Sequence, residues 1–287
     1  MAGCLYIVPT PIGNLGDITA RAVDVLRAVD LIAAEDTRHS KKLMTHLDVS
    51  TPMLAYHEHV DERATQSLVD KLLAGQSVAL ISDAGTPLVS DPGYRLVRAA
   101  QDAQCQVIPL PGACAAIAAL SASGLPTDRF TFEGFLPAKS TARLQRLRAL
   151  ATRSETLVFY EAPHRIVDCL ADMVAVMGVE REAVLAREIS KSFETIHRAP
   201  LGDLHRWVVS DANQQRGEQV LMLAPAHVRR GASKSGATEE AIDAAADTLL
   251  MRLAQVLPPR KAAAIVAETF GLKARDLYAY LLDRRGD

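Results

Sequence analysis

The sequence has few cysteines, almost no net charge and no long apolar run, and each shortage excludes a class of protein. The chain of 287 residues has four cysteines, without a Cys-x-x-Cys pair or paired histidines at zinc-site spacing. We therefore expect free, buried thiols. The formal net charge is only −2, so any contact with nucleic acid must come from a local basic patch and not from bulk charge.

No stretch reaches the roughly 18 consecutive apolar residues that a membrane span requires. The first residues contain no basic segment, and their apolar run breaks at Pro9, too early for a signal peptide. We expect a protein of the reducing cytoplasm without a membrane partner. The chain exceeds the usual size of one domain, and 49% hydrophobic and 23% charged residues are typical of a globular protein.

Short β-favouring runs alternate with amphipathic helical patterns in the first part of the chain. The runs lie at residues 4–8, 31–34, 53–56, 77–81 and 105–108, and the first helix follows Asp17, which we predict as its N-cap. Alternation of this kind predicts a mostly parallel sheet with helices on its faces. We assign this α/β domain to residues 1–120.

A second α/β domain of different topology is predicted over residues 121–226. Its apolar runs lie at 130–132, 156–160, 183–186 and 219–224, around a long helix at 164–177 that Gly178 ends. The short segment 191–197 between later strands indicates some antiparallel pairing. The sequence leaves the strand order open.

A linker and a small helical module complete the predicted organisation. Residues 227–238 form a basic linker with Arg229, Arg230 and Lys234, and residues 239–287 form a module with helices at 239–256, 259–270 and 274–283. The last two helices flank Gly271, as in a helix-turn-helix. Six basic residues stand against three acidic ones between 258 and 285, which favours RNA binding; a helical cap or dimer contact with solvated charges is the alternative.

Four loops rich in glycine and proline follow predicted strands, at residues 9–17, 35–38, 82–93 and 109–114. Ligands of open α/β sheets bind at the carboxyl ends of the strands, so these loops predict a preformed pocket. The pocket lacks the motifs of several enzyme classes. There is no Gly-x-Gly-x-x-Gly after the first strand, no phosphate loop, no His-Glu-x-x-His and no Gly-x-Ser-x-Gly.

These loops resemble the tetrapyrrole methylase superfamily and, within it, the 16S ribosomal RNA cytidine 2′-O-methyltransferases. The string Ser-Asp-Ala-Gly-Thr-Pro-Leu-Val-Ser-Asp-Pro-Gly at 82–93 is the most specific part of the resemblance. One departure is Cys114, where the family usually has serine. The resemblance extends over residues 5–16, 33–39, 81–93, 109–120, 132–137, 159–165 and the tail.

The resemblance implies a homodimer whose two α/β domains hold S-adenosylmethionine in a cleft, with 16S ribosomal RNA or the small ribosomal subunit as partner. Backbone amides suit the methionine carboxylate, and an apolar slot suits the adenine. Carried over residue by residue, the cofactor site comprises Ile12, Asp83, Ala84, Gly85, Thr86, Pro87, Val89, Cys114, Ala115 and, as a weaker candidate, Tyr160.

Methylation of a ribose hydroxyl is helped by a base that takes up its proton. Four residues near the predicted pocket are candidates: Glu35, Asp36, Lys139 and His164. Each also has a structural interpretation, because Glu35 or Asp36 can pair with Arg38 or cap a helix, Lys139 can contact phosphate or solvent, and His164 stands at a helix start.

We predict no metal site. His57 and His59 flank Glu58 and place two imidazoles on one face of a strand, but no third ligand accompanies them.

Two other functions remain open from the residues. One is a tetrapyrrole C-methyltransferase, which has the same cofactor but no evident use for a basic tail. The other is a ligand-sensing regulator that binds DNA through the helix-turn-helix.

Overall fold

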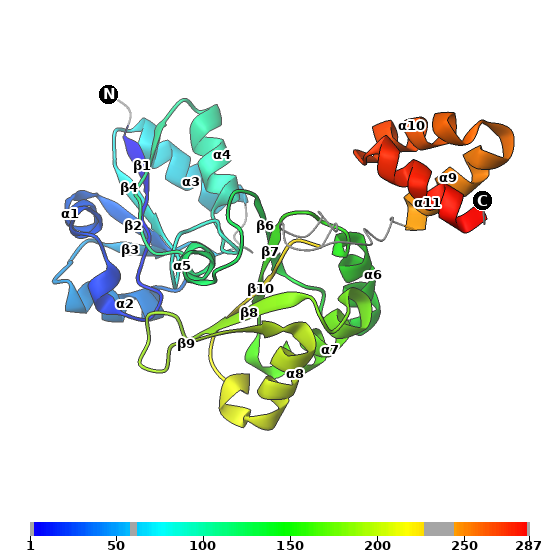
Figure 1. Cartoon of the computed structure of the whole chain (residues 1–287). Helices are drawn as coiled ribbons and strands as arrows, with labels where there is room; N and C mark the ends of the chain where they lie inside the picture. The colour runs from blue at the N-terminus through cyan, green and yellow to red at the C-terminus, as the bar shows by residue number, and fades with distance from the viewer. Residues whose placement is uncertain (1–2, 58–61, 227–243, 286–287) are drawn as a thin grey trace. The chain divides into compact units, whose positions relative to one another are not determined.

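A computed structural model describes residues 3–57, 62–226 and 244–285 of the chain (Figure 1). The chain divides into two compact units, Met1–Val228 and Arg229–Asp287. The first unit contains two five-stranded sheets, and the second is helical.

The first sheet is parallel throughout and has the strand order β3-β2-β4-β1-β5. The prediction of an α/β fold with a parallel sheet is confirmed. The strand bounds agree with the predicted runs to within one residue at each end: β1 Cys4–Ile7, β2 Leu31–Ala34, β3 Met53–Ala55, β4 Val78–Ile81 and β5 Gln106–Pro109.

Helices cover both faces of this sheet. Successive side chains of each strand point to opposite faces, so each strand packs against helices on both sides. Leu5 and Leu80 pack with helices α3 (Glu62–Leu73) and α4 (Tyr94–Asp102). Ala79 and Ile81 pack on the other face with α1 (Ala20–Ala28) and α2 (Thr37–His46). Strands buried on both faces read as continuous apolar runs, which is why the sequence showed them clearly.

The predicted N-cap of the first helix is wrong. Asn14 caps a 3₁₀ turn, η1 (Leu15–Asp17), and Asp17 ends that turn. The chain starts again at Thr19, whose hydroxyl accepts a hydrogen bond from the Ala22 amide at 3.1 Å, so Thr19 is the N-cap of α1. Asp17 and Thr19 are both residue types that cap helices well. Because the 3₁₀ turn ends at Asp17, the α-helix begins only after it and Thr19 is its cap.

The second sheet is mixed and has the strand order β6-β7-β10-β8-β9, which the sequence left open. Strands β6 and β7 are parallel, whereas β7, β10, β8 and β9 pair antiparallel, as the segment 191–197 indicated. The last strand in the chain is thus the central one. The bounds are β6 Phe130–Phe135, β7 Thr156–Glu161, β8 Glu182–Arg187, β9 Thr195–Pro200 and β10 Gln219–Leu223.

Helices α6 (Ser140–Leu150), α7 (Ile166–Met177) and α8 (Leu201–Ser210) cover one face of this sheet. Of these three helices, the sequence predicts α7 but not α6 or α8. Helix α7 follows a 3₁₀ turn, η2 (Pro163–Arg165). Another 3₁₀ turn, η3 (Ala212–Gln215), follows α8.

Helix α5 (Ala115–Ala122) covers the opposite face. Figure 1 shows α5 between the two sheets. Its side chains Ala116, Ala119 and Leu120 pack against Val158 and Val220 of the second sheet. The predicted domain boundary at residue 120 falls inside this helix, which follows the first sheet in the chain but packs on the second.

The C-terminal unit consists of helices α9 (Ala244–Val256), α10 (Pro259–Phe270) and α11 (Ala274–Arg285) around their own apolar core. Gly271 ends α10 in the left-handed conformation, with φ +65°. The helix-turn-helix expected at this glycine is therefore present. The linker 227–238 and residues 239–243 of the predicted first helix lie outside the described residues.

Within the part of the chain that the structure describes, no helix is long and apolar enough to cross a membrane.

Candidate functional site

Backbone and side-chain hydrogen bonds join the loops at the carboxyl edge of the first sheet. Thr10 and Gly85 exchange two backbone hydrogen bonds, of 2.9 and 3.0 Å. The Thr86 hydroxyl donates to the Ala113 carbonyl at 2.8 Å, which ties the loop after β4 to the loop after β5. The predicted convergence of these loops is therefore present as a bonded framework.

The loop after β2 joins the same framework through carboxylates. The Asp36 amide donates to Asp83 Oδ1 at 3.2 Å, and the Asp83 amide donates to Glu35 Oε2 at 3.3 Å. Asp36 itself accepts from the amides of Arg38 and His39 and is the N-cap of α2. These hydrogen bonds lower the pKa of Asp36, so its carboxylate is a weaker base than an ordinary one.

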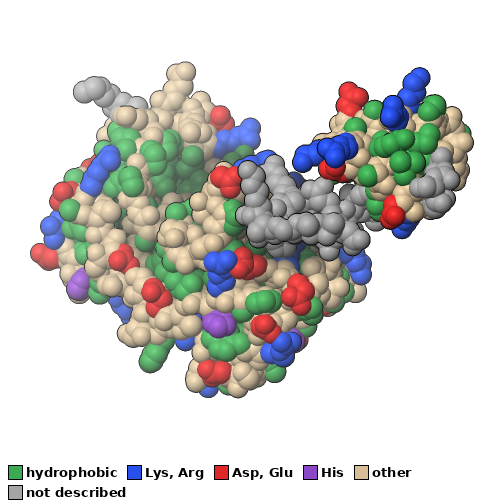
Figure 2. All heavy atoms as spheres, viewed as in Figure 1, with side chains coloured by type: hydrophobic (Ala, Val, Ile, Leu, Met, Phe, Trp, Pro, Cys, Tyr) green, Lys and Arg blue, Asp and Glu red, His purple; other side chains and the backbone are tan. Residues whose placement is uncertain are grey.

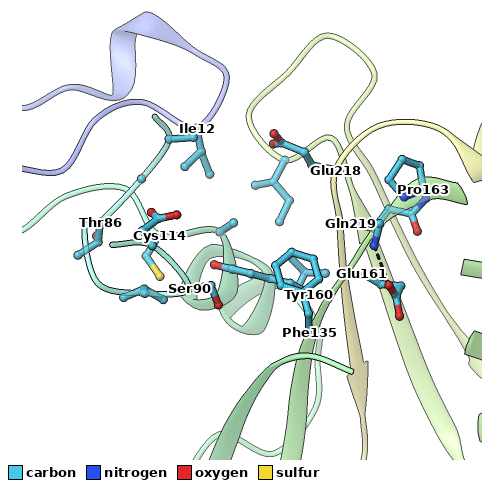
Figure 3. Close-up of a pocket in the computed structure, with 18 residues that line it drawn as sticks. Ile12, Thr86, Ser90, Cys114, Phe135, Tyr160, Glu161, Pro163, Glu218 and Gln219 are labelled. Carbon is cyan, nitrogen blue, oxygen red and sulfur yellow. Dashed lines mark hydrogen bonds between the residues drawn. The ribbon is translucent and has the colours of Figure 1, made fainter. Parts of the chain in front are cut away.

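A cavity of about 350 Å³ lies between these loops and the second sheet (Figure 3). Figure 3 shows Ile12, Thr86 and Cys114 on one side and Tyr160 and Glu218 on the other. Its walls are mostly apolar, and its residues come from both halves of the first unit. The lining consists of Ile12, Ala84, Gly85, Thr86, Val89, Ser90, Asp91, Cys114, Ala115, Phe135, Tyr160, Glu161, Ala162, Pro163, Ile189, Glu218, Gln219 and Val220.

Tyr160 holds α5 against strand β7. Its hydroxyl accepts a hydrogen bond from the Ala116 amide at 3.2 Å, and its ring meets Phe132 and Phe135 edge to face, at centroid distances of 4.9 and 5.7 Å. Burial raises the pKa of Tyr160, so its hydroxyl stays protonated. Cys114 makes no capping hydrogen bond with its side chain, and Cys114 and Ala115 both line the cavity.

An irregularity in β6 places an aromatic ring in the wall. The register with β7 shifts between Phe132 and Gly134, and Gly134 takes φ +63°. A Cβ at Gly134 would lie 3.4 Å from Ser90 Oγ, so the bulge approaches the loop of the other half closely. Phe135 follows and lines the cavity although it is half exposed.

The charged residues that line the cavity are all acidic. Glu161 is buried and pairs with Arg165, with Nε and Oε1 3.2 Å apart. Glu218 is exposed and pairs with Lys191 at 3.0 Å. Gln219 is buried, and its Oε1 has no hydrogen-bond partner among the described residues. Such an unpaired buried acceptor is costly and suits a ligand that carries an N–H donor.

The structure places most of the predicted cofactor residues in this cavity. Eight members of the set line it: Ile12, Ala84, Gly85, Thr86, Val89, Cys114, Ala115 and Tyr160. Asp83 and Pro87 do not, because Asp83 bonds to the loop after β2 and Pro87 is buried. The assignment of the residues to a cofactor stays a prediction.

The four predicted base candidates do not line the cavity. Asp36, Lys139 and His164 are exposed, and Lys139 is the N-cap residue of α6. Glu35 is partly buried and bonded to the Asp83 amide. The structural interpretation that the sequence offered for Asp36, a helix cap, is present.

The cofactor set predicted from the sequence lacked Ser90 and Asp91, and from the second sheet it contained only Tyr160, so the other residues of that wall were missed. Asp91 stood in the quoted loop string, but the string does not tell which of its polar residues face the pocket. Among the residues that the structure describes, no three His, Cys, Asp or Glu side chains form a group that could hold a metal ion. Glu58 and His59 of the metal hypothesis lie outside them.

The cavity lies between the all-parallel sheet and the mixed sheet of the first unit. The family model for tetrapyrrole (corrin/porphyrin) methylases matches residues 4–205, and the chain belongs to this family. A second model, described as the RsmI C-terminal HTH domain, matches residues 240–285. The chain is therefore a methyltransferase with a helix-turn-helix tail.

Relatives of known name match along the whole length. The chain is 54% identical to "Ribosomal RNA small subunit methyltransferase I" of Vibrio cholerae, over 100% of this chain and 96% of the relative. It is also 54% identical to the protein of that name from Pseudomonas aeruginosa, over 99% of each.

Solved structures share the fold at low identity. The Thermus thermophilus uroporphyrin-III C-methyltransferase in complex with S-adenyl homocysteine matches with a TM-score of 0.53 and 20% identity, covering 77% of this chain and 97% of that one. The methyltransferase CobJ matches with a TM-score of 0.58 and 18% identity, covering 80% and 98%.

Proposed function

We propose that this enzyme transfers a methyl group from S-adenosylmethionine to the ribose 2′-oxygen of a cytidine in 16S ribosomal RNA. The observation that carries the proposal is the full-length identity of 54% to two small-subunit RNA methyltransferases. A second observation supports the proposal. The chain has a cavity at the carboxyl edge of a parallel sheet, where ligands of α/β sheets bind.

The residues present fit S-adenosylmethionine. Ile12, Val89 and Val220 give an apolar slot for adenine, and the backbone at Cys114 and Ala115 opens α5, where a carboxylate is favoured. Gln219 Oε1 offers an acceptor to an amino group. The acidic groups nearby suit a ligand with an ammonium and a sulfonium. When bound, this cofactor supplies a methyl group that is already activated.

The chain's own residues position the reactants and exclude water. Phe135 and Tyr160 form an aromatic wall on the second sheet, and the bonded loops of the first sheet hold the opposite wall. Positioning of this kind speeds a transfer because the entropy of bringing the two groups together is lost on binding and not in the reaction step. A base near the hydroxyl adds the removal of its proton.

The C-terminal unit is proposed to bind RNA. Lys273 and Arg275 are exposed just after the turn of its helix-turn-helix, and Lys261 is exposed in the first turn of α10. Figure 2 shows charged side chains of this unit around a hydrophobic area on the drawn face. Exposed basic residues contact phosphates and make binding dependent on salt.

The two rival functions have less support. The tetrapyrrole enzymes match at 15–21% identity and cover only part of the chain. The full-length relatives are named as methyltransferases and not as regulators. We also propose that the enzyme is a homodimer and acts in the cytoplasm, where small ribosomal subunits are assembled.

Labelled methyl transfer tests the proposal. Purified enzyme is incubated with methyl-labelled S-adenosylmethionine and small subunits from cells that lack the protein. We expect label in 16S RNA that alkali releases as a dinucleotide containing cytidine, because a 2′-O-methyl group blocks cleavage at that ribose. Label released in single nucleotides, or found only on added uroporphyrinogen, would contradict it.

A further inference from the structure

An exposed aromatic ring stands at the mouth of the cavity, on the wall that the second sheet forms. Phe135 lines the cavity and is 52% exposed, whereas Tyr160 and Val220 of the same wall are partly or fully buried. The rings of Phe135 and Tyr160 meet edge to face at an angle of 64°, and Figure 3 shows the two side chains beside each other. Half of the Phe135 side chain therefore stays accessible to a ligand.

A β-bulge puts Phe135 on this face of the sheet. Side chains alternate between the two faces of a regular strand, so a β6 with Phe132 on the α5 face would place Phe135 on the face of α6 and α7. The register with β7 shifts after Phe132, however, and Phe135 pairs with Tyr160. The partners of the two phenylalanines, Val158 and Tyr160, are two residues apart and share the α5 face. The extra residue in β6 thus brings the ring to the cavity.

The chain that follows Phe135 is fixed in place. Leu136 is buried in the core that α6, α7 and α8 cover. Arg165 Nη2 donates to the carbonyls of Leu136 and Pro137, at 2.6 and 3.4 Å, and the same guanidinium pairs with buried Glu161. The exposed ring is therefore held in one position before a ligand arrives, which lowers the entropy that binding costs.

Two exposed polar side chains lie on the turns that Arg165 joins. Lys139 is exposed four residues after Phe135. His164 is exposed and precedes Arg165, whose hydrogen bonds hold its turn against the loop before Lys139. An ammonium attracts phosphate, and an imidazole N–H can donate to it. Because the charged residues that line the cavity are all acidic, RNA phosphates are favoured outside the cavity, on this rim.

A nucleobase is the ligand that suits an exposed ring beside a cation. Proteins bind unpaired nucleotides by stacking their bases on aromatic side chains and by placing basic groups along the backbone. The cofactor does not need this ring, because Ile12 and Val220 of the slot proposed for its adenine are buried. The second substrate is thus the candidate for Phe135.

We propose that Phe135 stacks on the base of the target nucleotide at the mouth of the cavity, and that Lys139 contacts a neighbouring RNA phosphate. This inference rests on the proposed function. A base that leaves its helix loses the contacts with its stacked neighbours, and the Phe135 ring replaces one of them. The ribose attached to a base on this ring lies at the entrance of the cavity proposed for S-adenosylmethionine.

Single-turnover methylation of small subunits at rising subunit concentration tests the stacking. Phe135→Ala should raise the half-saturating concentration about 5- to 150-fold, the range for loss of one stacked base. Phe135→Leu keeps an apolar side chain without an aromatic face and should be weakened similarly, whereas Phe135→Tyr should recover most of the affinity.

The control is Phe130→Ala, at the other end of β6, where the phenylalanine is 43% exposed and lies outside the cavity lining. It should stay within about threefold of wild type. A change of less than about threefold in Phe135→Ala, or full recovery by Phe135→Leu, would overturn the proposal.

Calorimetry with S-adenosylmethionine separates a ring that binds RNA from one that binds the cofactor. Phe135→Ala should keep its cofactor affinity within about threefold of wild type, which also shows that the variant is folded. A loss of cofactor affinity that matches the loss of subunit affinity would overturn the proposal. If wild type itself does not methylate small subunits, the proposed function fails; if it does and Phe135→Ala is equal to it, only this inference fails.

The salt dependence of subunit binding tests the phosphate contact. Lys139→Gln should reduce the salt slope by roughly one unit, while Arg206→Gln, at an exposed and ion-paired position on α8, should leave it unchanged. Equal slopes for Lys139→Gln and wild type would contradict the position proposed for the RNA backbone.

Discussion

The Tyr160 hydroxyl accepts a hydrogen bond from the Ala116 amide at 3.2 Å, and this contact joins the second sheet to the first turn of α5 beside the cavity. We expect Tyr160→Phe to leave that amide without its partner and to cost about 1–3 kcal/mol of stability. The affinity for S-adenosylmethionine should fall several-fold, because Ala115 and Cys114 lie in the same turn. Calorimetry measures both.

The control is Tyr6→Phe on strand β1, which packs against the core on the α1 and α2 face, away from the cavity. It should change cofactor affinity little. A Tyr160→Phe variant with unchanged affinity would mean that the turn keeps its position without this hydrogen bond.

Gly85 and Gly178 have similar positive φ angles but different surroundings, so alanine substitutions at the two positions can be compared. Both have positive φ, +85° and +87°. A Cβ at Gly85 would lie 3.1 Å from Ile12 Cγ2, whereas nothing lies within 4 Å of one at Gly178. Both Gly→Ala substitutions should destabilise the fold by about 1–2 kcal/mol through backbone strain. Only Gly85→Ala should also lower affinity for the cofactor, because it moves a cavity wall.

Isothermal titration of Gly85→Ala and Gly178→Ala with S-adenosylmethionine measures whether only Gly85→Ala loses affinity for the cofactor. Equal losses of affinity would show that lowered stability, and not the shape of the cavity, is the cause.

Burial raises the pKa of Asp91 to about 6, and this predicts a pH-dependent difference in stability. Between its usual value of 3.8 and about 6, the folded state binds the proton more tightly than the unfolded state. This group therefore stabilises the fold less as pH rises through that window, and above it the cost is constant. Two pKa units correspond to at most about 3 kcal/mol, and solvent screening of this partly exposed carboxylate makes the difference at pH 7 smaller.

Because Asn is neutral, Asp91→Asn should gain stability relative to wild type between pH 4 and pH 7. Denaturant unfolding at several pH values measures the gain. The control is Asp102→Asn, an exposed carboxylate at the end of α4, which should show no such rise. A difference in stability between Asp91→Asn and wild type that does not change with pH would contradict the burial of the Asp91 charge.

The C-terminal unit should bind RNA through phosphates. Replacing Lys261, Lys273 or Arg275 singly by Gln should weaken binding of small subunits and reduce its salt slope by roughly one unit each. Affinity for S-adenosylmethionine should stay unchanged. Arg206→Gln, at an exposed and ion-paired position on α8, is the control. Unchanged salt slopes in the three variants would favour a purely structural role for this unit.

The first sheet and its loops were predictable because both carry local signals. The strands of a doubly covered parallel sheet are short apolar runs, and glycine and proline mark the loops at their carboxyl ends. The loops alone predicted a pocket, and their family resemblance pointed to Ile12, Gly85 and Cys114, which do line the cavity.

The strand order of the second sheet was less predictable because it depends on pairing between strands that lie far apart in the sequence. Strand β10 lies between β7 and β8, so Gln219 reaches the cavity from the far end of the sequence. Helix α6 was missed because Arg143 occupies a core position and is paired with Asp172 at 2.7 Å, which disguises the apolar period. Asp91 was missed because no local pattern tells which loop residue faces the cavity.

Nucleoside analysis of 16S RNA tests the central claim most directly. Small subunits are taken from cells that lack this protein and from the same cells supplied with wild type or Asp102→Asn, and 2′-O-methylcytidine is mapped by mass spectrometry. We predict that one 2′-O-methylated cytidine disappears without the protein and returns with both supplied forms. An unchanged set of 2′-O-methylated cytidines in the deleted cells would contradict the account.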